Sequence, residues 1–167
     1  MENIILIGMP GCGKSTVGVV LAKALGMDFI DSDLLIQRRE GKCLAQIIEE
    51  AGDDGFRAIE NEVNAGIQAQ GCVIATGGSV IYGQEAMAHL RAIGTVVYLQ
   101  LSYEQVEERL GDLHARGVTV KPGQTLRDLY NERCPLYASY AHVTIPCDGL
   151  RLRDVVAQLR QTLGLDA

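Results

Sequence analysis

The sequence predicts an α/β fold with a five-stranded parallel sheet flanked by helices. Five short apolar segments alternate with longer segments of helical period along the chain. Strands that are buried on both faces by helical crossovers form a parallel sheet. No internal repeat, low-complexity run or Pro/Ser-rich linker divides the 167 residues. We therefore expect a single domain over residues 1–167.

The predicted strands are short and apolar-rich, and most are followed by Gly, Asp or Ser. They are Asn3–Ile7, Asp28–Ile30, Cys72–Ala75, Thr95–Leu99 and His142–Ile145. Such runs, bounded by turn residues, are typical of strands buried on both faces.

In the segments between the strands, apolar residues recur at helical spacing. The first predicted helix ends at Gly26. Its inward face repeats at i, i+3, i+4, i+7 and i+8, and consists of Val17, Val20, Leu21, Ala24 and Leu25. Ser102 begins another helix, with Gln105 as its capping-box partner. The last helix is expected over Leu152–Leu163.

Composition narrows the possible partners. The chain has 15 Lys+Arg against 21 Asp+Glu, a formal net charge of −6, which disfavours broad attraction to nucleic acid or to an anionic membrane. The apolar stretch at residues 4–7 is too short for a membrane span. Five scattered cysteines without metal-site spacing predict free thiols in a reducing compartment. We expect a cytoplasmic monomer that acts on small molecules, without nucleic-acid or membrane partners.

The strongest motif directly follows the first strand. Residues 8–16 read GMPGCGKST, which fits the G-x-x-x-x-G-K-[ST] pattern of a phosphate-binding loop. Its glycines let backbone N–H groups face phosphate oxygens, and the following helix adds its positive end. Lys14 is expected to reach the β- and γ-phosphates, and Ser15 to offer its hydroxyl to Mg²⁺. The alternative is a glycine-rich turn, and the flanking strand and helix argue against it.

Cys12 occupies a variable position of this loop. We interpret it as a small filler residue. The alternative is a thiol whose modification would inactivate the site.

An acidic cluster, Asp31-Ser32-Asp33, follows the second predicted strand. It stands at the carboxyl edge of the sheet, where ligands bind in parallel α/β folds. One carboxylate could hold Mg²⁺ through water while the other accepts a proton from an attacking hydroxyl. Alternatively, one of them only caps the helix that is expected to start near Leu34.

Further candidates for ligand contacts lie later in the chain. Arg57 and Glu60 stand at i and i+3, so Glu60 could orient the guanidinium, although such pairs are usually exposed surface pairs. Gly77 and Gly78 follow the third strand, where glycines allow close backbone approach to a ligand or simply form a loop. Three more arginines could supply local positive charge: Arg109, Arg116 and Arg133.

The weakest stretch for regular structure is residues 111–124. It contains three glycines, one proline and few large apolar residues. Loops longer than about a dozen residues are usually functional or disordered. We therefore interpret this segment as a mobile flap.

Together, these motifs resemble those of the shikimate kinase family over about Asn3–Leu163. The motifs GMPGCGKST, D-S-D, G-F-R-x-I-E, the glycine pair and R-x-P-L-Y occur in the family's order and approximate spacing. The resemblance implies a P-loop kinase three-layer sandwich. It also implies transfer of the ATP γ-phosphoryl group to the 3-hydroxyl of shikimate with Mg²⁺, giving shikimate 3-phosphate and ADP in chorismate and aromatic amino-acid biosynthesis.

The resemblance further implies residue roles. The residues expected to bind ATP are Gly11, Cys12, Gly13, Lys14, Ser15, Thr16 and Arg109. Those expected to bind shikimate are Asp33, Arg57, Gly77, Gly78 and Arg133. Ser15, and Asp31 through water, would hold Mg²⁺. The implied catalytic residues are Lys14, Asp33 and the flap residue Arg116. Thr76 replaces the first glycine of the family's usual run, which is expected to narrow that side of the pocket.

The sequence is also compatible with two other functions. One is a kinase of the same architecture for another carboxylated polyol, such as a gluconate-type kinase, or for a nucleoside monophosphate. The arginine pair with D-S-D favours a carboxylated polyol over a nucleobase. The other is a non-catalytic nucleotide-binding regulatory module, which the intact Lys14, Ser15 and Asp33 argue against.

Overall fold

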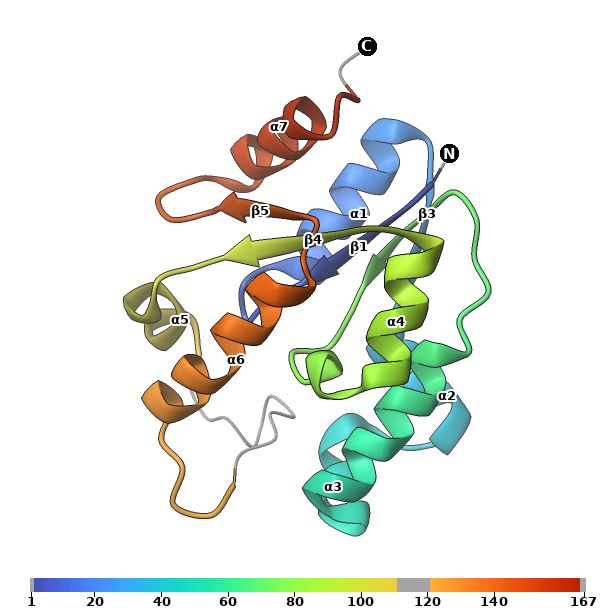
Figure 1. Cartoon of the computed structure of the whole chain (residues 1–167), viewed down its shortest axis with the longest axis vertical. Coiled ribbons are helices and arrows are strands. Elements are labelled where there is room, and N and C mark those ends of the chain that lie inside the picture. The colour runs from blue at the N-terminus through green and yellow to red at the C-terminus, as the bar shows by residue number, and fades with distance from the viewer. Residues whose placement is uncertain (1, 111–120, 166–167) are drawn as a thin grey trace.

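The five predicted strands form one parallel sheet (Figure 1). The computed structural model describes residues 2–110 and 121–165. The strands are β1 (Asn3–Ile7), β2 (Asp28–Asp31), β3 (Cys72–Ala75), β4 (Gly94–Gln100) and β5 (Val143–Pro146). Their order across the sheet is β2-β3-β1-β4-β5, and every neighbouring pair is parallel. This confirms the predicted sheet, with strand ends shifted by one residue at most.

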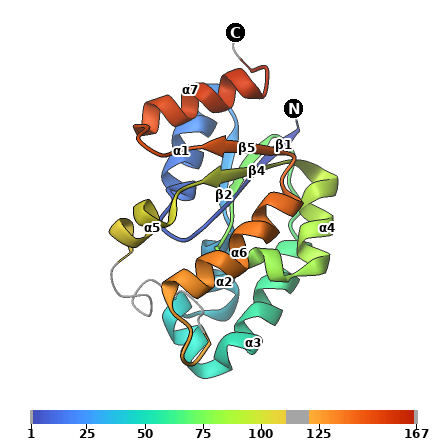
Figure 2. The same cartoon turned by 60° about the vertical axis from the view of Figure 1, so that its left-hand side comes forward.

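Helices cover both faces of this sheet. They are α1 (Lys14–Leu25), α2 (Ser32–Glu40), α3 (Leu44–Ala65), α4 (Gln84–Ile93), α5 (Tyr103–Arg109), α6 (Leu126–Tyr140) and α7 (Leu152–Thr162), with a 3₁₀ turn η1 (Val80–Tyr82). α1 and α7 lie on one face, and α4 and α6 lie on the other (Figures 1 and 2). The expected three-layer arrangement is therefore present.

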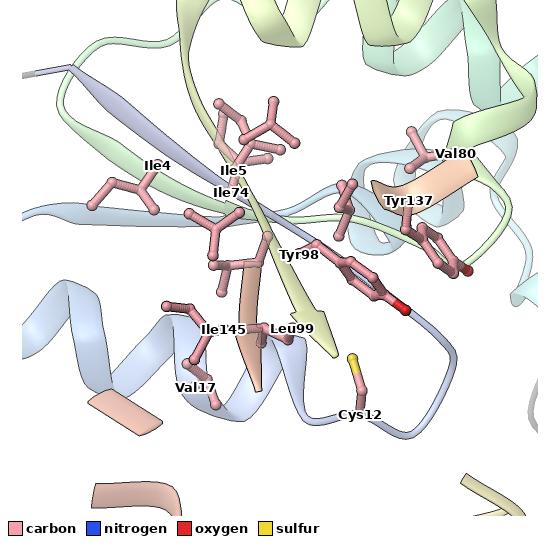
Figure 3. Packing of buried hydrophobic residues seen from close by; sticks show 14 of the residues in the cluster. Ile4, Ile5, Cys12, Val17, Ile74, Val80, Tyr98, Leu99, Tyr137 and Ile145 are labelled. Atoms are coloured by element: carbon pink, nitrogen blue, oxygen red, sulfur yellow. The ribbon is translucent and has the colours of Figure 1, made fainter. Parts of the chain in front are cut away.

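The main core lies on both faces of β1 and its neighbours. Every residue of β1 is buried, as are all four residues of β3. Side chains from several elements interdigitate there, including Ile74 of β3, Leu99 of β4 and Val17 of α1 (Figure 3). Each fully buried aliphatic side chain contributes roughly 1.5–3 kcal/mol. This packing makes the sheet a rigid platform for the loops that leave its carboxyl edge.

Local end signals explain two helix boundaries. α1 ends at Gly26, whose φ of 68° lets its N–H reach the Ala22 and Lys23 carbonyls. α5 begins after Ser102, whose hydroxyl accepts from the Gln105 backbone N–H. The predicted capping box is wrong in its second half, because the Ser102 N–H donates to Asp148 Oδ1 instead of to Gln105.

The structure describes only the last part of the predicted flap. Arg116 and most of the predicted flap at 111–124 lie outside the described residues. Within the described residues, none of the helices combines the length and apolar character needed to cross a bilayer. All five cysteines are free, as expected.

Candidate active site

The site forms where the connections of the sheet change direction. β1 is central, with β3 on one side and β4 on the other. The chain passes from β1 to the β2-β3 side and then crosses back to β4, so a crevice is expected at the carboxyl end of β1. The loop that carries GMPGCGKST leaves the sheet at this point.

The loop turns directly into α1. Gly13 is the residue before the helix, and its φ of 93° and ψ of 18° are left-handed, which side-chain-bearing residues adopt at a cost. The first turn of α1 has no acidic residue, so its N–H groups and positive end remain available to an anion. Lys14 is 8% exposed, and its Nζ donates to the carbonyls of Gly8 (2.7 Å) and Met9 (3.0 Å).

Two further side chains adjoin this loop. Cys12 is 3% exposed, points into the core in Figure 3, and accepts from Lys14 Nζ at 3.7 Å. Its burial fits the interpretation of a small filler residue. Arg109, at the end of α5, donates to the Gly11 carbonyl at 3.4 Å, so this arginine lies against the loop as expected for an ATP-side residue.

Asp31 has two partners that link the acidic cluster to the loop. Its Oδ1 accepts from the Asp33 backbone N–H at 3.0 Å, which makes it the N-cap of α2. The helix therefore begins at Ser32, two residues earlier than expected. Its Oδ2 accepts from Ser15 Oγ at 2.8 Å. The capping interpretation is thus correct for Asp31, whose other oxygen contacts Ser15.

The Ser15–Asp31 pair fits a magnesium site. A hydroxyl and a carboxylate are the oxygen ligands that Mg²⁺ prefers, and Mg²⁺ usually keeps several waters and binds substrate phosphates. Among the described residues there is no cluster of three or more His, Cys, Asp or Glu suited to a metal. The Ser15 hydroxyl and the Asp31 carboxylate offer few ligands, which suits an ion that also binds nucleotide phosphates and water.

A cavity of about 340 Å³ opens beside the loop. Its walls include loop residues together with Asp33, Glu60, Gly77, Gly78 and Arg133. These residues come from α2, α3, the turn after β3, and α6. The fold thus gathers most of the predicted site residues around one small, polar cavity.

Two carboxylates face each other in this cavity. Asp33 Oδ1 and Glu60 Oε2 each lie 2.7 Å from the point that a Cβ on Gly77 would occupy. Neither oxygen has a hydrogen-bond partner. Burial, together with the charge of Asp31, raises the pKa of Asp33 to about 6, although Lys14 opposes the shift. Glycine at position 77 leaves room for ligand hydroxyls to reach both groups.

Glu60 differs from the sequence-based expectation. It is 1% exposed, and its Oε1 accepts from the Ser79 hydroxyl. Burial raises the pKa of Glu60 to about 7, the Ser79 hydrogen bond lowers it, and Asp33 raises it further. Glu60 forms no ion pair with Arg57, so the predicted i, i+3 pair is wrong, and Glu60 is instead a cavity residue.

Arg133 supplies positive charge to the cavity. It lies on α6 and is 1% exposed. Its Nη1 lies 2.9 Å from the point that a Cβ on Gly78 would occupy. The hydroxyl of Tyr137, one turn further along α6, donates to the Gly78 carbonyl at 2.6 Å. The glycine turn and the arginine are therefore held together from the same helix.

Arg57 stands apart from this group. It does not line the 340 Å³ cavity but borders a neighbouring one of about 440 Å³. Its guanidinium lies over the ring of Tyr82, with Cζ 4.0 Å from the ring centroid. Sequence reasoning missed Tyr82, because one aromatic residue after a glycine pair carries no recognisable pattern. The flap residue Arg116 lies outside the described residues.

Thr76 also lines the cavity, and its hydroxyl donates to the Leu6 carbonyl at 2.8 Å. This hydrogen bond links the residue after β3 to the carboxyl end of β1. That Thr76 narrows this side of the cavity stays a prediction.

A phosphate-binding loop that faces an acceptor cavity across the switch point of such a sheet defines the class of P-loop kinases of small molecules. A family model described as shikimate kinase matches residues 10–164. The chain belongs to the shikimate kinase family.

Individual relatives agree with this assignment. The chain is 41% identical over 167 residues to the shikimate kinase of Alteromonas mediterranea, covering 98% of each chain. It is 39% identical to that of Pasteurella multocida, covering 95% of this chain and 93% of the relative. A solved structure of the Acinetobacter baumannii shikimate kinase in complex with shikimate superposes with a TM-score of 0.86 at 37% identity, covering 98% of this chain and 94% of that one.

Proposed function

We propose that this site binds ATP and shikimate side by side and transfers the γ-phosphoryl group to the 3-hydroxyl of shikimate. Membership of the shikimate kinase family supplies the overall reaction. The observation that carries the residue assignment is the unpartnered Oδ1 of Asp33, which lines one cavity with the phosphate-binding loop and the buried Arg133. A hydroxylated acid in that cavity would meet an acceptor group, a cation and the phosphate loop together.

The loop and Lys14 bind the phosphates in this proposal. Backbone N–H groups and the start of α1 stabilise negative charge without reorganisation during the reaction. Lys14 Nζ exchanges the Gly8 and Met9 carbonyls, its partners in this structure, for phosphate oxygens. Arg109 donates to the Gly11 carbonyl, a position beside the loop from which it can contact the nucleotide.

Ser15 and, through water, Asp31 would hold Mg²⁺, as their mutual hydrogen bond at 2.8 Å supports. When bound, the ion offsets the negative charge that spreads over the phosphates during transfer.

Asp33 acts on the acceptor. As the new O–P bond forms and the bond between Pγ and the ADP oxygen breaks, the proton of the 3-hydroxyl moves to Asp33 Oδ1. Phosphoryl transfer passes through a loose transition state, so alignment of the hydroxyl contributes more than proton removal. Glu60 Oε2, which like Asp33 Oδ1 lies 2.7 Å from the point that a Cβ on Gly77 would occupy, accepts a hydrogen bond from another ring hydroxyl.

The acceptor carboxylate is recognised by arginines. A planar guanidinium forms two parallel hydrogen bonds with a carboxylate, which a lysine cannot do. Arg133 lies in the cavity wall, whereas Arg57 lines the separate cavity of about 440 Å³, together with Tyr82. Arg116 would approach the transferring phosphate from the flap. Closure of the flap over both substrates would exclude water and so suppress ATP hydrolysis.

The chain is proposed to act as a cytoplasmic monomer. Five free thiols are typical of a reducing compartment, which supports the proposed location.

An acceptor panel tests the function directly. ADP release would be measured with shikimate, gluconate and a nucleoside monophosphate at equal concentrations. We expect ADP release that depends on shikimate, with rates at least about a hundredfold lower for the other two. Faster turnover with gluconate or the nucleotide would contradict the proposed acceptor. ATP binding without any acceptor-dependent ADP release would identify a non-catalytic module.

A further inference from the structure

Two arginines from different helices share one aromatic ring. The Arg57 Cζ atom, on α3, lies 4.0 Å from the centroid of the Tyr82 ring, and the Arg133 Cζ atom, on α6, lies 5.5 Å from it. Both distances are within the range in which a guanidinium is attracted to the face of a ring. Tyr82 therefore connects the two residues proposed to recognise the acceptor carboxylate.

The contact with Tyr82 leaves one hydrogen-bonding edge of Arg57 without a partner among the described residues. A guanidinium uses its flat face to contact a ring and its in-plane N–H groups to bind a carboxylate. The Nε and Nη2 atoms of Arg57 are buried and have no hydrogen-bond partner. These two nitrogens form the side-on edge that binds a carboxylate through two hydrogen bonds. The ring thus contacts Arg57 while this buried edge keeps its hydrogen-bonding capacity unused.

No acidic residue holds Arg57. Its expected partner, Glu60, bonds to Ser79 instead. The described ion pairs include none with Arg57. A long side chain without an ion pair would sample many rotamers, and ordering it on binding would weaken affinity. Contact with a ring reduces this cost because it limits the orientations of the guanidinium beforehand.

Tyr82 itself is fixed by the glycine turn. It ends η1, and its backbone N–H donates to the Ser79 carbonyl at 3.1 Å. Its hydroxyl faces Glu132 and Arg133 of α6. The ring therefore keeps a defined place relative to Gly77 and Gly78, which border the acceptor cavity.

We propose that Tyr82 is a positioning residue, which fixes the guanidiniums of Arg57 and Arg133 for bidentate recognition of the acceptor carboxylate. This inference rests on the proposed function, because it assigns the two arginines to the carboxylate of shikimate. In this proposal the aromatic ring of Tyr82 positions the two guanidiniums, and the Tyr82 hydroxyl is not required for it.

Steady-state kinetics of three variants test the inference. Tyr82→Leu removes the ring, Tyr82→Phe keeps the ring without the hydroxyl, and Tyr103→Leu serves as the matched control. Tyr103 lies under Arg127 with a centroid distance of 3.8 Å, away from the acceptor cavity. We expect Tyr82→Leu to raise the KM for shikimate about tenfold, with kcat and the KM for ATP within about twofold. Tyr82→Phe and Tyr103→Leu should leave the KM for shikimate within about twofold.

A second acceptor separates carboxylate recognition from general damage. The carboxamide analogue of shikimate lacks the negative charge, so its KM should be equally high in wild-type protein and in Tyr82→Leu. If Tyr82→Leu does not fold, Tyr82→Trp supplies the test, since a larger ring should keep the KM for shikimate at or below the wild-type value. A tenfold increase in Tyr82→Trp would overturn the inference.

Two failures are distinguishable. A wild-type protein that does not phosphorylate shikimate would refute the proposed function itself. An active wild-type protein whose KM for shikimate is unchanged in folded Tyr82→Leu, or raised as much in Tyr103→Leu, would refute only the role of Tyr82.

Discussion

At the scale of single residues, the cavity is unusual in holding two unpartnered carboxylate oxygens close together. Asp33 and Glu60 approach Gly77 from α2 and α3. Buried carboxylates without hydrogen-bond donors are costly, and such groups concentrate at functional sites. This arrangement leads to one prediction about catalysis, for Asp33, and one about stability, for Glu60.

Asp33→Asn should reduce kcat with shikimate by about a hundredfold, because the amide neither accepts the hydroxyl proton nor aligns it in the same way. The loss should appear in kcat more than in the KM for ATP. Asp28→Asn is the control, since this exposed aspartate begins β2, the strand that precedes α2, at the end far from the cavity. Turnover near the wild-type rate in Asp33→Asn would remove Asp33 from the mechanism.

Glu60→Gln should make stability less dependent on pH. Burial raises the pKa of Glu60 from 4.5 to about 7, with Ser79, Asp33, Arg133 and Arg57 facing it. The folded protein therefore keeps a proton that the unfolded chain releases over this range. The free energy of unfolding consequently falls as pH rises from about 4.5 to about 7.

In Glu60→Gln this fall should be smaller by roughly 1–3 kcal/mol, at about 1.4 kcal/mol per pKa unit. Chemical denaturation at pH 5 and pH 8 would measure it. Glu62→Gln, at an exposed position two residues later, should retain the wild-type slope. An identical slope in Glu60→Gln and wild type would show that Glu60 keeps its ordinary pKa.

At the scale of elements, α1 joins the nucleotide loop to the core. Both of its ends are left-handed glycines, Gly13 with φ 93° and Gly26 with φ 68°. An added Cβ would meet only Val17 Cγ2 at 3.9 Å at the first position and no atom within 4 Å at the second. Substitution by alanine therefore strains the backbone at both positions without a steric clash.

Gly13→Ala and Gly26→Ala should each lower the free energy of unfolding by about 1 kcal/mol. Only Gly13→Ala should also weaken ATP binding, since it alters the direction of the N–H groups that face the phosphates. Calorimetric titration with an ATP analogue, together with thermal unfolding, would measure both effects. Equal ATP affinity in the two variants would mean that the Gly13 geometry does not serve nucleotide binding.

At the scale of the whole molecule, the proposed mechanism assigns a role to Arg116 of the predicted flap. Arg116→Ala should lower kcat by at least about tenfold while changing ATP affinity much less, since the arginine is assigned to the transferring phosphate. Lys121 is the nearest other candidate in the flap, and its Nζ lies 3.6 Å from Glu132 Oε1. If Lys121→Ala lowers kcat and Arg116→Ala does not, the lysine serves that role.

Much of this molecule could be predicted from local sequence signals. Strand positions, the end of α1 at Gly26 and the phosphate-binding loop all depend on residues close together in the chain, so spacing and residue type were sufficient. The acidic cluster does follow β2, but its residues alone did not show which of the two aspartates caps the helix. Asp31 caps α2 and bonds Ser15, whereas Asp33 lines the cavity, and only the start of the helix at Ser32 separates the two roles.

The sequence by itself determined the class of sheet, the nucleotide loop and the set of residues available for an acceptor. Only the tertiary structure decided how that set is divided: Glu60 turns to Ser79 rather than to Arg57, and Tyr82 lies under two arginines. Those contacts join α3, α6 and the turn after β3, which are distant in sequence. Such contacts depend on which buried polar groups can form hydrogen bonds with one another once the helices pack on the sheet. Sequence patterns within one short segment do not determine them.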